Sequence, residues 1–208
     1  MCHLANVHYS LIGDMHIALD ETMDTHCDMT RLTDTLFPLA FVQIAEGGDV
    51  DKMFEELAQR LHQMRWRVGG FLQRTIAEPQ SRHATMYLEN IATHQITMLS
   101  QPLGAGSSGC RLNFDVLGQA TYELATKINT DYDVLILNRF GKAESEGQGF
   151  RSVIAAALEY ELPVITAVKP IYREAWDLFA AEFAQELPFE LERLLDWSCS
   201  NLKPIDCS

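Results

Sequence analysis

The segment YDVLILNRFGKAESEGQGFR, residues 132–151, decides the fold class of this chain. Four apolar residues, Val134 to Leu137, run directly into Asn138, and a glycine and a dense set of charges follow. A short apolar run bounded by turn residues predicts a strand that is buried on both faces. The segment therefore indicates an α/β domain in which a polar loop follows a buried strand.

The same pattern recurs from residue 37 to residue 198. Further strands are predicted at 38–45, 67–73 and 162–168, with a hairpin over 84–100. Amphipathic helices are predicted around 49–61, 115–128, 149–160, 172–183 and 189–197. Short apolar strands alternating with helices predict a three-layer domain, with a mainly parallel sheet covered on both faces and a small hairpin insertion.

Ligands of such folds bind beyond the carboxyl ends of the strands. The candidate ligand loops therefore follow residues 45, 73, 138 and 168, and Gln73 lies at the second of these points. The preceding strand contains Gly69 and Gly70. Glycines inside a strand predict a bulge or the close approach of another backbone.

Charge and hydropathy exclude several classes of partner. The chain has 29 acidic and 16 basic residues, a net charge of −13. Nucleic-acid affinity comes largely from neutralising phosphates, so we expect no nucleic-acid partner. No apolar run approaches the ~20 residues that span a bilayer, and the N-terminus lacks the basic and apolar regions of a secretory signal. We therefore expect a cytoplasmic protein without a membrane partner.

Residues 1–36 form an atypical N-terminal extension, and residues 199–208 are predicted to be a C-terminal tail. The histidines and cysteines of the extension are Cys2, His3, His8, His16, His26 and Cys27. These residue types suit zinc or copper, but their irregular intervals match no known ligand spacing. A poorly ordered extension is therefore favoured over a metal site, and no metal ligands are predicted.

The loop AEGGDVDKMF, residues 45–54, stands where a P-loop would stand. A P-loop, G-x-x-x-x-G-K-[ST], needs glycines and a lysine around the phosphates and a hydroxyl for magnesium. Gly47, Gly48 and Lys52 are candidate anion-binding residues, whereas Asp51 precedes the lysine and Met53 replaces the hydroxyl residue. The alternative is a strand–turn–helix connection with no ligand.

The loop after residue 137 stands where a Walker B block would stand. Asn138 replaces the aspartate that holds magnesium, and its neutral oxygen is a much weaker partner for a hard dication. Glu144 is the candidate catalytic residue, because it would orient a water molecule. The candidate ligand-binding residues of this block are Asn138, Arg139, Gly141 and Lys142. The alternative is a solvated network of surface charges.

The third candidate is GAGSSGCR, residues 104–111. Successive backbone N–H groups in such a loop can form an anion-binding nest, with Arg111 as a bidentate donor. The candidate anion-binding residues here are Gly104, Gly106, Ser107, Ser108, Gly109 and Arg111. The alternative is a loop whose Arg111 packs on the surface.

Four segments, RWRVGGFLQR, GAGSSGCRL, DVLILNRFGKAESEGQGFR and LPVITAV, together resemble the bacterial family of domain of unknown function 2478 over residues 37–198. That family is similar to small nucleoside-triphosphatases of the P-loop class, which carry a Walker A loop, a glycine-containing second strand and a DEIGxxE block. Gly69 and Gly70 match the second element, and Gly141 and Glu144 match the third. Asn138, followed by arginine, stands in place of the Asp–Glu pair.

The resemblance implies a P-loop NTPase-like fold and an association with molybdate uptake. Because the motifs are degenerate, the leading hypothesis is a regulatory or accessory protein that binds a nucleotide or a small oxyanion without efficient hydrolysis. The cofactor, if there is one, would be a nucleotide with magnesium. One alternative is an active Mg-dependent nucleoside triphosphatase that uses Lys52 and Glu144. The other is a non-catalytic interaction protein.

Overall fold

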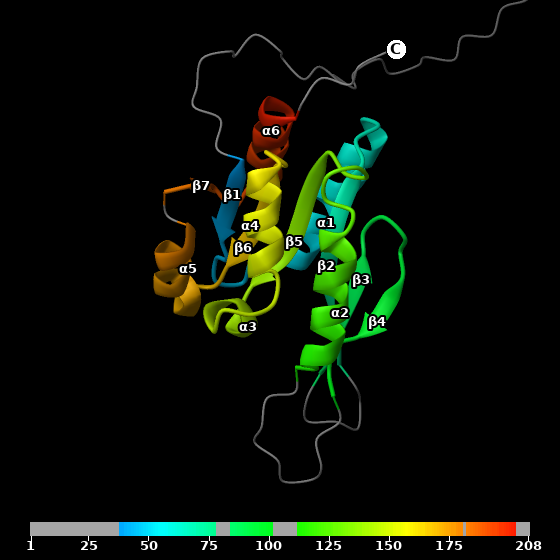
Figure 1. Cartoon of the computed structure of the whole chain (residues 1–208). Helices are drawn as coiled ribbons and strands as arrows, with labels where there is room; N and C mark the ends of the chain where they lie inside the picture. The colour runs from blue at the N-terminus through cyan, green and yellow to red at the C-terminus, as the bar shows by residue number, and fades with distance from the viewer. Residues whose placement is uncertain (1–37, 78–83, 102–111, 181, 203–208) are drawn as a thin grey trace, which may run out of the picture.

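The computed structural model describes residues 38–77, 84–101, 112–180 and 182–202. These residues form a seven-stranded sheet with the order β4-β3-β2-β5-β6-β1-β7 (Figure 1). The strands are β1 (Leu39–Gln43), β2 (Val68–Ile76), β3 (Thr85–Asn90), β4 (Ile96–Met98), β5 (Val134–Phe140), β6 (Val164–Val168) and β7 (Ala184–Leu187). Strands β2, β5, β6, β1 and β7 run parallel, and β3 and β4 extend the sheet beyond β2 as the predicted antiparallel hairpin.

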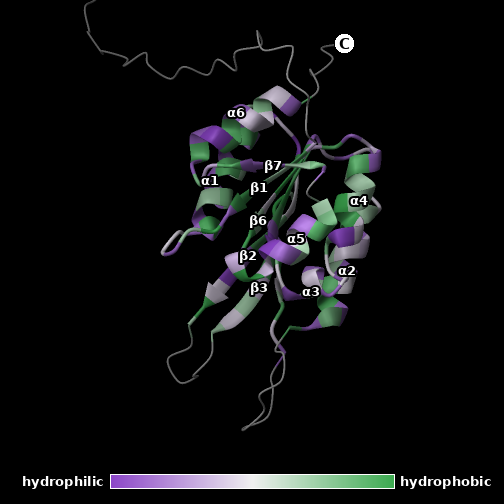
Figure 2. Ribbon diagram, turned by 90° about the vertical axis from the view of Figure 1, so that its left-hand side faces the viewer, coloured by the Kyte–Doolittle hydropathy of each residue, from purple (hydrophilic) through white to green (hydrophobic). Residues whose placement is uncertain are grey.

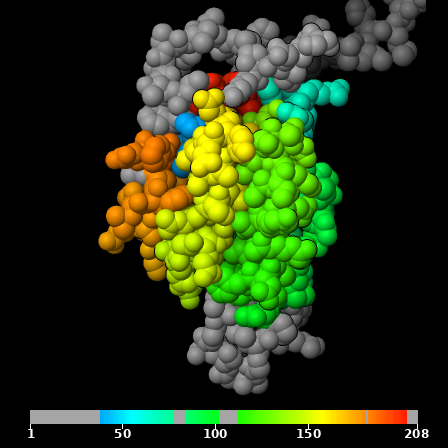
Figure 3. Space-filling view, viewed as in Figure 1, coloured from blue at the N-terminus to red at the C-terminus, as the bar shows by residue number. Residues whose placement is uncertain are grey.

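Helices cover both faces of the sheet, which confirms the three-layer α/β prediction. The helices are α1 (Val50–Gln63), α2 (Phe114–Ala125), α3 (Lys142–Ser145), α4 (Arg151–Glu159), α5 (Arg173–Ala180) and α6 (Leu191–Asn201), with a 3-10 turn at Pro170–Tyr172. Helices α1 and α6 lie on one face, and α2, α4 and α5 lie on the other (Figure 2). On the second face α4 and α2 pack side by side, with α5 next to α4 (Figure 3).

The apolar run in β5 is continuous because both of its faces are buried. Leu135 and Leu137 pack toward α2 and α4, while Val134 and Ile136 pack toward α1 and α6. All four side chains are at most 1% exposed. Full burial of such a side chain contributes about 1.5–3 kcal/mol, so this strand is a main source of the stability of the domain.

The close backbone approach predicted at the glycine pair is present at Gly70. This residue has a φ of +112° and pairs with Ile136 of β5. A Cβ at position 70 would overlap the carbonyl oxygen of Ile136 and lie 2.8 Å from its carbonyl carbon. Only glycine therefore allows β2 to lie this close to β5.

Four segments differ from the sequence predictions. Strand β2 runs to Ile76, three residues beyond its predicted end, so Gln73 lies inside the strand and not in a loop after it. The predicted loop 139–149 begins with the end of β5 and contains α3. The helix predicted over 172–183 ends at Ala180, and the edge strand β7 follows it. Strand β7 reads AQEL and buries only Leu187, so no apolar alternation marks it in the sequence. Helix α2 ends at Ala125, three residues earlier than predicted.

The predicted extension 1–36 lies outside the described residues. At the other end, α6 runs to Asn201, into the first part of the predicted tail. Within the described ranges, no helix combines the length and the apolar character needed to cross a membrane.

Candidate functional site

A cavity of about 250 Å³ lies beside the second half of β2 and the end of β5. Its walls come from both strands, from the hairpin β3–β4, from the start of α2, from α3 and from the residues after β6. The lining residues are Gln73, Met86, Leu88, Leu99, Leu112, Leu117, Asn138, Arg139, Gly141, Lys142, Ala143, Glu144, Phe150, Lys169 and Tyr172. This is the ligand-binding edge that parallel α/β sheets use.

The cavity combines an apolar wall with a positively charged one. Leucine, methionine and phenylalanine side chains form the apolar wall, whereas Arg139, Lys142 and Lys169 supply three cationic groups. Glu144 is the single carboxyl group among the lining residues. Lys169 forms no ion pair with any residue in the described ranges, and the ammonium of Lys142 lies 3.9 Å from the carboxylate of Glu146. Arg139 pairs with Asp51 at 2.7 Å, so the less compensated positive charge of the lining comes from Lys142 and Lys169.

An irregularity in β5 brings Asn138 and Arg139 to this cavity. The register between β5 and β6 shifts between Leu137 and Phe140, so the two polar residues lie outside the regular ladder. The buried hydroxyl of Thr166 donates a hydrogen bond to the carbonyl oxygen of Leu137 at 2.7 Å, which stabilises the strand just before the shift. Such bulges commonly redirect side chains next to functional sites.

Asp51, in the first turn of α1, connects that helix to the end of β5. Its Oδ1 accepts hydrogen bonds from Nδ2 of Asn138 at 2.5 Å and from Nη2 of Arg139 at 2.7 Å. Because an ionised carboxylate only accepts hydrogen bonds, the amide nitrogen of Asn138 must face Asp51. Oδ1 of Asn138 and Nε of Arg139 are buried without a hydrogen-bond partner among the described residues. We call this contact the Asp51 clasp.

The resemblance to P-loop proteins implies a magnesium ion at this point, but the residues present do not fit one. Asn138 presents N–H groups rather than an oxygen toward α1, and the Asp51 carboxylate already pairs with a guanidinium. Met53, at the position of the hydroxyl ligand, packs against the core on the α1 face. Within the described ranges, no three His, Cys, Asp or Glu residues gather in a possible metal site. No step of the proposed function therefore depends on a metal.

The loop after β1 forms a tight turn. Gly47 has a φ of +75°, the N–H of Gly48 donates to the carbonyl of Ala45, and a Cβ at Gly48 would lie 3.0 Å from the ring of Phe189. Oδ1 of Asp49 accepts a hydrogen bond from the backbone N–H of Lys52 at 3.0 Å, so a carboxylate caps the N-terminus of α1. This position, which would attract phosphate in a P-loop, already holds negative charge.

Glu144 holds the loop around α3 in place. It is 4% exposed, and its two carboxylate oxygens accept hydrogen bonds from the backbone N–H groups of Gly141 at 2.9 Å and Phe150 at 3.0 Å. Burial raises the pKa of Glu144, and the hydrogen bonds from the backbone oppose that shift. Gly149, with a φ of +61°, leaves room for this carboxylate, because a Cβ there would overlap Oε1.

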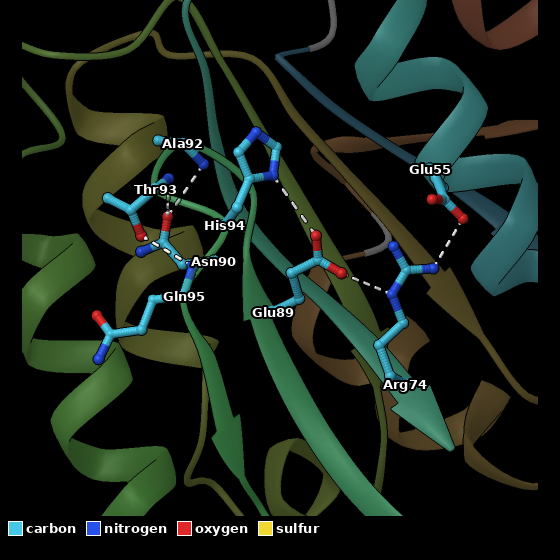
Figure 4. A network of polar contacts seen from close by, with 8 residues as sticks. All are labelled: Glu55, Arg74, Glu89, Asn90, Ala92, Thr93, His94 and Gln95. Atoms are coloured by element: carbon cyan, nitrogen blue, oxygen red, sulfur yellow. Dashed lines mark hydrogen bonds and ion pairs between the residues drawn. The ribbon is translucent and has the colours of Figure 1, made fainter. Parts of the chain in front are cut away.

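Ion pairs on the opposite face of the hairpin fix one wall of the cavity. Side chains alternate across a strand, so Leu88 lines the cavity while Glu89 faces α1. Arg74 donates to Glu89 at 2.6 Å and to Glu55 of α1 at 2.7 Å, and His94 lies 3.5 Å from Glu89 (Figure 4). Both carboxylates raise the pKa of Arg74, which stays charged. These contacts tie the hairpin to α1.

Six of the predicted site residues meet at the cavity, namely Gln73, Asn138, Arg139, Gly141, Lys142 and Glu144. The predicted residues Gly47, Gly48 and Lys52 do not line it, and the Lys52 side chain is exposed. The predicted nest 104–111 lies outside the described residues, although Leu112, the next residue, lines the cavity.

Sequence reasoning missed Lys169, Tyr172 and the apolar wall. Lys169 immediately follows β6, and the sequence had already predicted a candidate ligand loop after residue 168. A cationic residue at the end of this strand was therefore a signal that could have identified Lys169. The apolar wall carries no such signal, because its residues resemble ordinary core positions.

Comparison with known proteins gives three findings. The family described as "Protein of unknown function (DUF2478)" matches residues 39–197. The chain is 32% identical over 149 residues to the "Molybdenum import ATP-binding protein ModC 2" of Bradyrhizobium diazoefficiens, covering 72% of this chain but only 17% of that protein. A human cancer-related nucleoside triphosphatase has a similar fold, with a TM-score of 0.54, 14% identity, and coverage of 72% of this chain and 87% of that one.

Proposed function

The chain belongs to the DUF2478 family, and from this premise we propose that it binds a small oxyanion, or the phosphate end of a nucleotide, without efficient hydrolysis. The ligand would lie in the cavity between β2 and the end of β5. The mostly parallel α/β fold, shared with a nucleoside triphosphatase, supports a nucleotide-related ligand. The role would be regulatory or accessory.

The observation that carries this proposal is the local charge. The whole chain has a net charge of −13, yet three cationic groups and one buried carboxyl line the cavity. Arg139 is paired with Asp51, so Lys142 and Lys169 carry the positive charge on which the proposal depends. Burial raises the pKa of that carboxyl, Glu144, which weakens its preference for the charged form. Cationic groups beside an apolar wall attract anions more strongly than they would in open water.

The size of the cavity favours a small ligand. Its volume of about 250 Å³ lies just below the ~300–1,000 Å³ that is typical of small-molecule sites. A tetrahedral oxyanion fits this space with room to spare. A whole nucleotide would place only part of itself there, which is why we propose its phosphate end.

Two observations count against the alternative of an active nucleoside triphosphatase. Hydrolysis of a nucleotide needs phosphates held by a lysine and a metal, and a group that positions water. Lys52 does not line the cavity, and both oxygens of Glu144 are already bound to backbone N–H groups. Glu144 therefore suits the positioning of the loop better than proton transfer.

Molybdate is the oxyanion that we propose first. The support is the partial similarity to a protein named for molybdenum import and ATP binding. Molybdate is a tetrahedral dianion, and a ring of cations with few carboxylates can hold such an ion by charge-assisted hydrogen bonds. The chain would then report or buffer the oxyanion as an accessory to its uptake.

Calorimetric titration of the full chain with molybdate, phosphate, sulfate and ATP tests this proposal. Lys169→Ala and Lys142→Ala should each weaken binding about 3- to 10-fold, because each removes one charged contact. Lys52→Ala is the matched control: it removes an exposed cation outside the cavity and should leave affinity unchanged.

The control also identifies the competing site. A loss of binding in Lys52→Ala but not in Lys169→Ala would place the anion at the loop after β1 and refute the cavity assignment. Absence of binding by all four anions would refute the proposed function and favour the non-catalytic interaction protein.

A further inference from the structure

We propose that this site takes its oxyanion without a divalent cation, and that Asp51 sets the affinity by competing with the ligand for Arg139. The inference rests on the proposed function and deepens it. Its basis is the Asp51 clasp, which joins the start of α1 to the end of β5. In a metal-dependent P-loop site the ion would connect these two elements.

The Asp51 clasp connects α1 to the end of β5, as a bridging cation would in a metal-dependent site. The guanidinium of Arg139 neutralises the Asp51 carboxylate at 2.7 Å, and both side chains are largely buried, at 17% and 26% exposure. A dication placed between α1 and β5 would have to displace a guanidinium and would find an amide N–H₂ rather than an oxygen at Asn138. Lys142 and Lys169 would repel it further.

The clasp also leaves hydrogen-bonding groups unused. Nε of Arg139 and Oδ1 of Asn138 are buried and have no partner in the described part of the chain. Buried polar groups are normally paired. An oxyanion can only accept hydrogen bonds, so it would supply a partner for Nε of Arg139 but not for Oδ1 of Asn138. A planar guanidinium that turns toward an oxyanion can donate two parallel hydrogen bonds to it. The ligand and Asp51 therefore compete for the same donor groups.

With this competition, the apparent affinity for the oxyanion is reduced in proportion to the fraction of molecules in which Arg139 is not paired with Asp51. Removing the charge of Asp51 should therefore strengthen binding, although it removes a contact from the folded protein. Asp51→Asn keeps the size of the side chain and an acceptor oxygen but cannot form the ion pair. Asp49→Asn is the matched control, because it removes the same charge two residues away and asparagine still caps α1.

The test is a titration of wild type, Asp51→Asn and Asp49→Asn with sodium molybdate and with ATP, each in EDTA and in excess magnesium. We expect wild type to bind in EDTA at least as tightly as in magnesium. We expect Asp51→Asn to bind on the order of tenfold more tightly, and Asp49→Asn to stay within about twofold of wild type. A thermal melt confirms that each variant is folded.

The outcomes separate this inference from the proposed function. Binding that needs magnesium in wild type, or that weakens in Asp51→Asn, would overturn the inference and leave the proposed function standing. An equal gain in both variants would show a general charge effect and would also overturn it. No binding in any condition would overturn the proposed function and this inference together. The comparison of EDTA with magnesium needs only the wild-type chain, so it holds even if a variant is unstable.

Discussion

Gly70→Ala is the substitution for which the structure gives the clearest expectation. Gly70 lies inside β2 with a φ of +112°, opposite Ile136 of β5. An alanine methyl group would meet the backbone of Ile136 rather than a movable side chain, with its carbonyl carbon at 2.8 Å. The overlap can be relieved only by moving β2 away from β5 or by changing the backbone of β2.

Two costs add up to the expected loss. Holding a non-glycine residue in a disfavoured backbone region costs about 1–3 kcal/mol, and forcing an extra carbon into a packed site costs about 1–3 kcal/mol. We therefore expect Gly70→Ala to lower the free energy of unfolding by about 4 kcal/mol. The free energy of unfolding of a native domain is only about 5–15 kcal/mol, so the expected loss is a large fraction of the stability.

Gly118→Ala provides the matched control. Gly118 lies in α2, is exposed, and has no atom within 4 Å of its potential Cβ. The same chemical change there should stabilise the protein by about 0.5–1 kcal/mol, because alanine is the better helix former.

Urea unfolding followed by circular dichroism measures both variants. With a slope of about 2 kcal/mol/M, Gly70→Ala should lower the midpoint by about 2 M, and Gly118→Ala should raise it slightly. A Gly70→Ala chain that does not fold agrees with the reasoning. A Gly70→Ala free energy within about 1 kcal/mol of wild type, or equal losses in both variants, would refute it.

Two further substitutions test the contacts that support the cavity. Glu144→Gln should cost about 1–3 kcal/mol, because one backbone N–H loses its acceptor. Burial raises the pKa of Glu144 above 4.5, so ionising this group lowers the stability of the wild type as pH rises from there. The difference in unfolding free energy between wild type and Glu144→Gln should therefore shrink with rising pH in unfolding titrations. A difference that grows with pH would contradict this. Arg74→Ala should cost about 1–2 kcal/mol at low salt and less in about 1 M NaCl. Arg74 lowers the pKa of Glu55, so the stability that Arg74 contributes through this pair should decrease as pH drops below 4.5. A loss of stability in Arg74→Ala that depends on neither salt nor pH would indicate lost packing instead.

Much of the fold follows from local patterns in the sequence. The run Val134–Leu137 predicted a strand buried on both faces, and Gly69–Gly70 predicted a close backbone approach, which Gly70 makes. Strand β7 was missed because an edge strand with one buried residue has no periodic apolar signal. Helix α3 was missed because it is a single short turn, held by the Glu144 side chain rather than by helix propensity.

The candidate site was predictable only in part. Asn138 and Arg139 were predicted as site residues because the fold class dictates that ligands bind beyond strand ends. Gln73 was predicted for the same reason, and it lines the cavity although β2 continues past it to Ile76. The Asp51 clasp was not predictable, because its partners are 87 and 88 residues apart in the sequence. The apolar wall joins residues from β3, α2 and the α3–α4 connection, and only the tertiary fold brings them together.

The most direct test of the central claim is to map where an oxyanion binds. Backbone amide chemical shifts of the full chain, recorded by NMR during a titration with molybdate in EDTA, report on each loop separately. The proposed site predicts saturable changes at Gly141, Lys142 and Phe150, with little change at Gly47 and Gly48. Changes centred on the loop after β1, or no saturable change at all, would contradict the claim that this cavity binds the anion.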